Sequence, residues 1–174
     1  MVERKMKKQK MTRDTIPEDF TLSLALIDAL PVLFFCGSII LIGLMFRKVL
    51  FLIGALLCFW AGAAKVIWKI IVVTKKKNIW WLFMQMRIVM PVGFLLILLS
   101  VILNLKAIKL SVILSAVISM PSVVFFAIGI VGMILMGIFA SKLDSSDVRS
   151  NWIEQITNSL AQGSIFVGIL LLIF

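Results

Sequence analysis

The chain of 174 residues contains no histidine and no tyrosine, and it has only two cysteines. Without histidine, imidazole ligation of a metal or haem and Ser–His catalysis are excluded, and tyrosine chemistry is excluded as well. Cys36 and Cys58 both lie within apolar runs and form no CxxC motif, so neither a disulfide framework nor a metal site is indicated. There is no Gly-rich phosphate loop and no paired-carboxylate motif. We therefore expect no cofactor and no metal, and nothing in the sequence specifically supports an enzyme.

Acidic residues are also scarce, with 8 Asp and Glu against 18 Lys and Arg, for a formal net charge of +10. In a soluble protein such an excess would suggest a nucleic acid partner. Here the basic residues fall mainly at the ends of apolar runs, where Lys and Arg mark cytoplasmic loops. The hydrophobic share of 62% exceeds the roughly one half of a soluble domain. We expect lipid, and no nucleic acid, to surround this chain.

Five apolar runs follow a polar, basic tail over residues 1–20, and each is long enough to cross a bilayer, for which about 20 apolar residues suffice. The sequence predicts an all-α integral membrane protein in which residues 21–174 form a single five-helix transmembrane domain, with several helices broken or kinked at proline. In the last run only the second half is fully apolar, and we keep it as a span because its polar residues share one face. The predicted helices cover about 21–46, 49–73, 79–103, 110–140 and 152–174.

The distribution of basic residues predicts the topology. With the N-terminus inside, the cytoplasmic segments hold eleven Lys and Arg residues and the outer loops hold four, which agrees with the positive-inside rule. We expect a multi-pass protein of the plasma (cytoplasmic) membrane with the N-terminus in the cytoplasm and the C-terminus outside. The basic tail should attract anionic lipid headgroups.

Polar side chains within the runs carry the functional signal. At about 1.5 Å rise per residue, most of them lie roughly 9–14 Å from the cytoplasmic boundary. Four helices thus place ionisable or amide groups at one level. The candidate ligand-binding residues are Asp28, Lys65, Gln85, Arg87, Glu154, Asn158 and Gln162.

One interpretation of this layer is structural. Charges in a bilayer cost roughly 2.5–3.5 kcal/mol each on insertion scales, and they normally face the bundle interior, pair or line a wet cavity. Asp28 with Arg87 and Glu154 with Lys65 can form ion pairs that fix the helix register, and the amides can hydrogen-bond between helices. Lys69, one turn from Lys65, can snorkel to the cytoplasmic interface.

The other interpretation is functional, because ionisable residues inside a membrane are functional candidates by default. The same groups would line a cavity that is open to the cytoplasm and that binds or conducts a polar or charged ligand. In that case the basic pair would hold anionic groups, the acidic pair would hold cations or protons, and two amides would orient the ligand. These roles fall to Arg87 and Lys65, to Asp28 and Glu154, and to Asn158 and Gln162, respectively.

Prolines are the predicted helix breaks. Pro31 and Pro91 follow Asp28 and Arg87 by three and four residues, and Pro121 interrupts the fourth run. A proline removes the helical bond to the carbonyl four residues back. The freed carbonyls of Ile27 and Arg87 would be ready ligands for water, a cation or a side chain.

These observations favour a small polytopic membrane protein that binds or transports a small polar or ionic solute through a charged cavity near the cytoplasmic side. The main alternative is a non-catalytic scaffold or accessory subunit of a larger membrane complex, with the charges as static pairs. Such a role would involve a membrane protein partner or a second copy of the chain. A lipid-modifying enzyme that uses Asp28, Glu154 or Lys65 is a further alternative, but no specific motif in the sequence supports it.

Overall fold

The computed structural model describes residues 21–143 and 148–174, and within these ranges all regular secondary structure is helical. Five helical segments are long and apolar enough to cross a bilayer, which confirms the predicted all-α fold. Large apolar side chains are exposed along all five, as contact with lipid requires. The chain is thus an integral, multi-pass membrane protein. Its helices are α1 (Leu22–Ile27), α2 (Ala29–Phe46), α3 (Val49–Lys75), α4 (Trp80–Leu103), a 3₁₀ turn η1 (Leu105–Ala107), α5 (Leu110–Ile118), α6 (Ser122–Lys142) and α7 (Val148–Ile173).

The last span is longer than the sequence suggested. α7 is one helix of 26 residues that begins at Val148, four residues before the predicted start. Its polar first half therefore continues directly into its apolar second half. The basic tail over residues 1–20, predicted to be cytoplasmic, lies outside the described residues.

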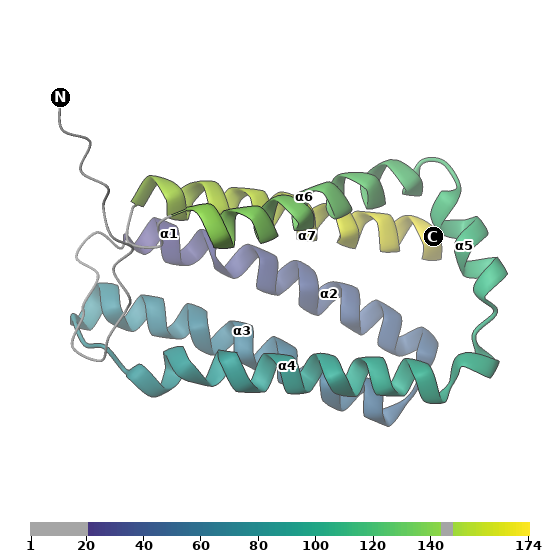
Figure 1. Ribbon diagram of the computed structural model, residues 1–174, viewed down its shortest axis with the longest axis horizontal. Helices are drawn as coiled ribbons and strands as arrows, with labels where there is room; N and C mark the ends of the chain where they lie inside the picture. Colours follow the sequence, from purple (N-terminus) through teal and green to yellow (C-terminus); the bar gives the residue numbers. More distant parts are fainter. Residues whose placement is uncertain (1–20, 144–147) are drawn as a thin grey trace.

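The apolar run over 110–140 forms two helices where the sequence predicted one. α5 ends at Ile118, Ser119 is extended, and Pro121 caps the start of α6 behind a cis peptide bond. Proline lacks the N–H of a helical bond, and it biases the residue before it away from helical geometry, so both effects favour a helix break at this point. α5 lies across one end of the bundle (Figure 1), and α6 alone supplies the fourth candidate span, Ser122–Phe139.

The other two prolines of the spans lie within helices. Pro91 is inside α4, which runs without interruption from Trp80 to Leu103. Pro31 is the third residue of α2, in the first turn, where the N–H groups have no intrahelical partner in any case. α1 and α2 meet at Asp28, whose backbone angles stay helical and whose N–H bonds to the carbonyl of Leu24.

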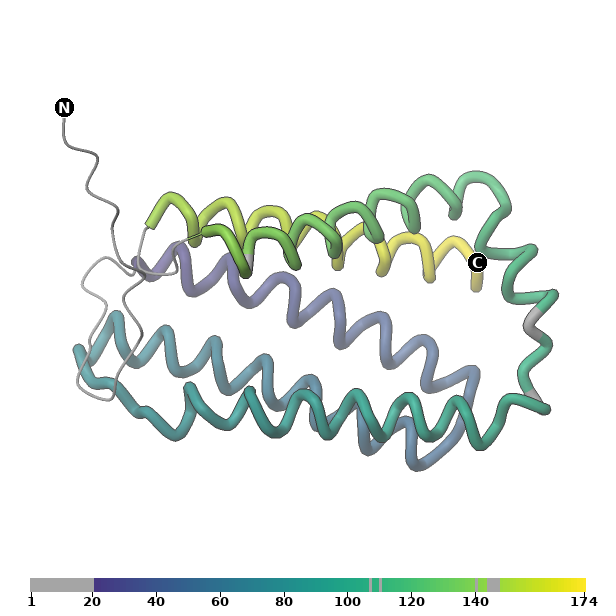
Figure 2. Tube along the Cα trace, in the orientation of Figure 1, coloured from purple at the N-terminus to yellow at the C-terminus, as the bar shows by residue number. Residues whose placement is uncertain are grey.

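The helices are arranged as two pairs with α2 between them. α3 packs with α4 and α6 packs with α7, while α2 contacts α3 on one side and α7 on the other (Figures 1 and 2). Along the described residues, α4 and α6 do not contact each other. The space between the two pairs is therefore bounded by α2 but is not closed by direct packing of α4 on α6.

Glycines let the two helices of each pair approach closely. A Cβ added at Gly54 of α3 would lie 2.6 Å from the carbonyl oxygen of Gly93 in α4. In the other pair, a Cβ at Gly132 of α6 would lie 2.6 Å from the Cβ of Ala161 in α7. Lipid tails are as apolar as leucine, so membrane helices associate through such close packing more than through a hydrophobic driving force. The small residues thus define the two pairs.

An apolar cluster fills the end of the bundle at which α1 begins. Leu24, Trp68 and Val72 are fully buried there, and the indole N–H of Trp68 donates to the side-chain oxygen of Asn78 at 3.0 Å. Trp152 of α7 packs against the same cluster. Phe83 of α4 packs against it as well, so α1, α3, α4 and α7 meet next to the polar residues of the bundle.

We expect Gly54→Ala to destabilise the protein. The new Cβ would meet backbone atoms of α4, the oxygen of Gly93 at 2.6 Å and the nitrogen of Ile97 at 2.9 Å. Neither atom can rotate away, so the helices must separate, and such overpacking typically costs about 1–3 kcal/mol. The measurement is the midpoint of thermal unfolding of the purified protein in detergent. Gly137→Ala is the matched control, because nothing lies within 4 Å of its added Cβ; an equal loss in both variants would contradict the prediction.

Candidate functional site

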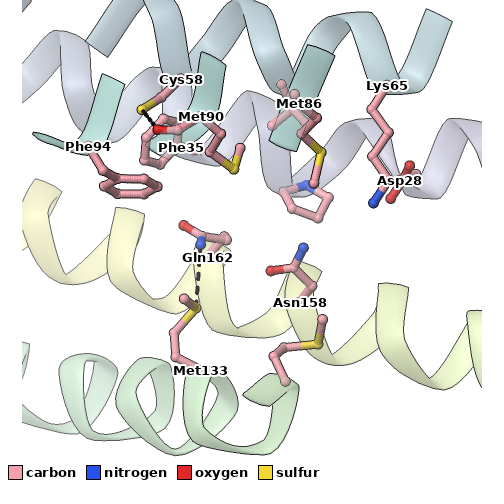
Figure 3. A pocket seen from close by; sticks show the side chains of 14 residues that line it. Asp28, Phe35, Cys58, Lys65, Met86, Met90, Phe94, Met133, Asn158 and Gln162 are labelled. Carbon is pink, nitrogen blue, oxygen red and sulfur yellow. Dashed lines mark hydrogen bonds between the residues drawn. The ribbon is translucent and has the colours of Figure 1, made fainter. Parts of the chain in front are cut away.

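A cavity of about 320 Å³ lies between the two helix pairs. In Figure 3, Asp28 and Lys65 lie together at one end of this cavity, Cys58 and Phe94 lie at the other, and two amide side chains project from α7 between them. The lining residues come from α2, α3, α4, α6, α7 and the junction of α1 with α2: Asp28, Pro31, Val32, Phe35, Cys58, Gly62, Lys65, Met86, Met90, Phe94, Met133, Met136, Asn158 and Gln162.

Three of the polar lining groups, Asp28, Lys65 and Asn158, lie toward the same end of the bundle. α1 begins, α3 ends and α7 begins at the same end of the molecule (Figure 1). Asp28 lies six residues from that end of its segment, and Lys65 and Asn158 lie ten residues from theirs. At about 1.5 Å per residue these positions are roughly 9 and 15 Å deep. The polar end of the cavity is therefore inside the membrane, nearer to the predicted cytoplasmic surface.

Four of the seven predicted site residues line the cavity, namely Asp28, Lys65, Asn158 and Gln162. The amide nitrogen of Gln162 donates to the sulfur of Met133 at 3.5 Å (Figure 3). These four residues come from the junction of α1 with α2, from α3 and from α7. The other three predicted residues do not line it.

Asp28 forms an ion pair with Lys69. The Nζ of Lys69 lies 2.8 Å from Oδ2 of Asp28, and both side chains are almost fully buried. The pair Asp28–Arg87 that the sequence suggested is not formed, and Lys69 does not snorkel to the interface. The reason is rotational: Lys69 shares the inner face of α3 with the buried residues Ala61, Val72 and Trp68, so its ammonium points into the bundle.

Lys65 lies one turn deeper on α3, faces the cavity and is only partly buried. Among the described residues its ammonium makes no ion pair and no hydrogen bond. Lys65 and Lys69 are one turn apart on the same helix, so their two ammonium groups repel each other. The carboxylate nearest to the cavity is thus already neutralised by Lys69, and Lys65 is the cation that the cavity presents.

Gln85 and Arg87 have different surroundings from those expected. Gln85 is buried against α3, where its amide donates to the carbonyl of Ala61 at 3.1 Å and to that of Leu82 at 3.3 Å. Arg87 is exposed on the outside of the bundle, with its guanidinium 5.5 Å from the ring centre of Phe83. Gln85 therefore joins α4 to α3, and Arg87 faces the surroundings of the bundle.

Glu154 is half-buried on α7 and does not line the cavity. The next residue on α7, Gln155, is buried and was not among the predicted site residues. The sequence interpretation also placed Lys69 at the interface and not in the polar layer, and it missed the methionines of the cavity wall. For Lys69 a signal was present, because a residue one turn after Lys65 must lie on the same face of α3.

Among the prolines, Pro31 lines the cavity. On α4, the carbonyl of Met90, next to Pro91, accepts a weak hydrogen bond from the thiol of Cys58 at 3.7 Å. A ligand role for the carbonyls of Ile27 and Arg87 stays a prediction. Pro121 lies between α5 and α6, away from the lining residues.

We compared the chain with protein-family models, with curated proteins and with solved structures, and none of the three comparisons gives a match.

We expect Asp28 and Lys69 to be energetically coupled. Asp28→Leu or Lys69→Met alone leaves one buried charge without its partner, a change that typically costs about 3–5 kcal/mol. The double variant removes both charges and should lose clearly less than the sum of the two single losses. The free energy of unfolding in mixed detergent micelles measures the coupling.

The control for this cycle pairs Asp28→Leu with Arg87→Gln. Because Arg87 is exposed and forms no ion pair with Asp28, the two losses should add within about 0.5 kcal/mol. Additive losses for Asp28 and Lys69 would contradict a direct ion pair.

Proposed function

We propose that the protein binds a small polar or ionic solute in the cavity between its two helix pairs, near the predicted cytoplasmic side. One observation carries the proposal: Lys65 faces the cavity without an ion pair among the described residues, while the neighbouring Asp28 is neutralised by Lys69. A charged side chain inside a bilayer costs roughly 2.5–3.5 kcal/mol unless water, a partner or a ligand compensates it. A solute bound at Lys65 supplies that compensation.

The remaining polar lining suits such a solute. Asn158 and Gln162 each offer an amide N–H₂ donor and a carbonyl acceptor to the cavity. The volume of about 320 Å³ is at the lower end of ligand pockets, which span about 300–1,000 Å³. Beyond the amides the cavity ends in apolar residues such as Phe94, so these residues support binding more directly than conduction across the membrane.

A second candidate function is that of a scaffold or accessory subunit. The observation that favours it is Arg87, a charged residue exposed on the outer surface of a membrane-spanning helix. An acidic side chain on a partner helix would neutralise it at that depth. If this function holds, a protein that co-purifies with the chain in fixed ratio should be lost from the Arg87→Gln variant.

Water access to the cavity tests the main proposal. In a background of Cys36→Ala and Cys58→Ala, we expect Asn158→Cys to react with a charged methanethiosulfonate reagent in membranes. Leu160→Cys should react at least about tenfold more slowly, because the side chain of Leu160 is exposed on the outside of the bundle. A charged reagent does not partition into the hydrocarbon that surrounds that face. The measurement is the rate of mass increase of the purified protein.

A further control is Ala161→Cys, because Ala161 is fully buried against α6 and should be unreactive. If Asn158→Cys reacts no faster than these two controls, the cavity is dry and the proposed binding of a polar solute is wrong. Static ion pairing would then describe the polar layer.

A further inference from the structure

The wall of the cavity changes from polar to apolar along its length. At one end lie Asp28, Lys65 and Asn158, whereas the other end is formed by Cys58, Phe35 and Phe94 (Figure 3). Four methionines, Met86 and Met90 of α4 and Met133 and Met136 of α6, line the same cavity. Methionine is flexible and polarisable, and it adapts to apolar ligands of irregular shape. A purely polar solute makes no favourable contact with this apolar part, whereas an amphiphile can contact the polar end with its head group and the apolar part with its chain.

The side from which such a ligand can arrive follows from the helix contacts. α4 and α6 both contribute methionines to the wall, yet they do not contact each other along the described residues. α2, which contacts α3 and α7, bounds the opposite side. In a bilayer the gap between α4 and α6 faces lipid, so a chain already dissolved in the membrane can lie between the two methionine pairs.

The sign of the head group follows from Lys65. Its ammonium is the cation presented to the cavity, and the carboxylate of Asp28 beside it is held by Lys69 at 2.8 Å. An anionic head gains a charge-assisted contact with Lys65 and hydrogen bonds from the amide of Asn158. A cationic head would meet an ammonium instead, with like-charge repulsion at low dielectric.

We infer that the ligand is an anionic amphiphile, with a carboxylate or phosphate head at Lys65 and a single hydrocarbon chain between α4 and α6. The volume of about 320 Å³ favours one chain over the two chains of a bilayer phospholipid. This inference rests on the proposed function, since it names the class of solute that the same site binds.

The experiment uses the full-length protein in phosphatidylcholine vesicles with a palmitic acid that carries a photoactivatable diazirine in its chain. After illumination, we expect cross-links on the peptides that contain Met86 and Met90 of α4 and Met133 and Met136 of α6. Unlabelled palmitate should compete, and hexadecylamine at the same concentration should not. Competition by lysophosphatidic acid, tested against free phosphate as a headgroup without a chain, distinguishes a phosphate head from a carboxylate.

Charge at Lys65 is tested with matched variants. Lys65→Gln should lower the cross-linked yield by about tenfold, and Lys65→Arg, which keeps the charge, should restore at least half of it. Arg87→Gln removes a basic residue that does not line the cavity, and it should leave the yield within twofold of the unmodified protein. Elution as a single species in size-exclusion chromatography verifies that each variant is folded.

The outcomes separate this inference from the function on which it rests. Three results would each overturn the inference that the ligand is an anionic amphiphile. They are cross-links spread over outward residues such as Leu160, a cross-linked yield in Lys65→Gln equal to that of the unmodified protein, and competition by hexadecylamine equal to that by palmitate. If Asn158→Cys still reacts with the charged reagent in that case, the cavity binds a wholly polar solute and only the present inference fails. If that reaction is also absent, both proposals are wrong.

Discussion

The ion pair of Asp28 with Lys69 is the contact on which the polar layer depends. It joins the junction of α1 and α2 to α3 at a separation of 2.8 Å, where almost no solvent reaches either group. Breaking a buried pair by removing one partner costs far more than removing both. Asp28 is the acidic residue that lines the cavity, and it is already paired with Lys69. The neighbouring Lys65 therefore has no ion-pair partner among the described residues. One buried contact therefore decides both how three helical segments are held and which charge the cavity presents.

Packing explains why a cavity exists at this place. Glycines bring α3 against α4 and α6 against α7 at distances that leave no room for a Cβ. α2 cannot bring the pairs equally close, because it carries phenylalanines toward both: Phe34 lies over Phe166 of α7, and Phe35 lies near Phe94 of α4. Two tight pairs held apart by aromatic side chains leave a space between them. The flexible methionines of α4 and α6 border this space, and no direct contact of the two helices closes it.

The sequence predicts how far along its helix a residue lies better than it predicts which way the residue faces. The length of each apolar run predicts a membrane helix, so the five spans could be predicted. Counting residues along each helix also placed Asp28, Lys65 and Asn158 toward the same end of the bundle. The rotation of a helix is harder to predict in lipid, because its outer and inner faces are both apolar and no amphipathic pattern distinguishes them. Arg87 and Gln85 are close in depth to Asp28, yet one is exposed and the other is bonded to α3. α3 is the exception, since its small residues mark its inner face and place Lys69 on it.

Charge balance favours binding over a purely static role for this layer. A static role for the inner charges needs only that they be paired, and the pair Asp28–Lys69 satisfies that requirement at the junction of α1 and α2. Lys65 adds a second ammonium one turn away that repels Lys69 and faces a cavity. In a static bundle this residue contributes an insertion cost and a repulsion, and neither is offset by a contact among the described residues. Water or an anion in the cavity, as proposed above, would offset both, so the proposed occupant would turn an unfavourable ammonium into a favourable contact.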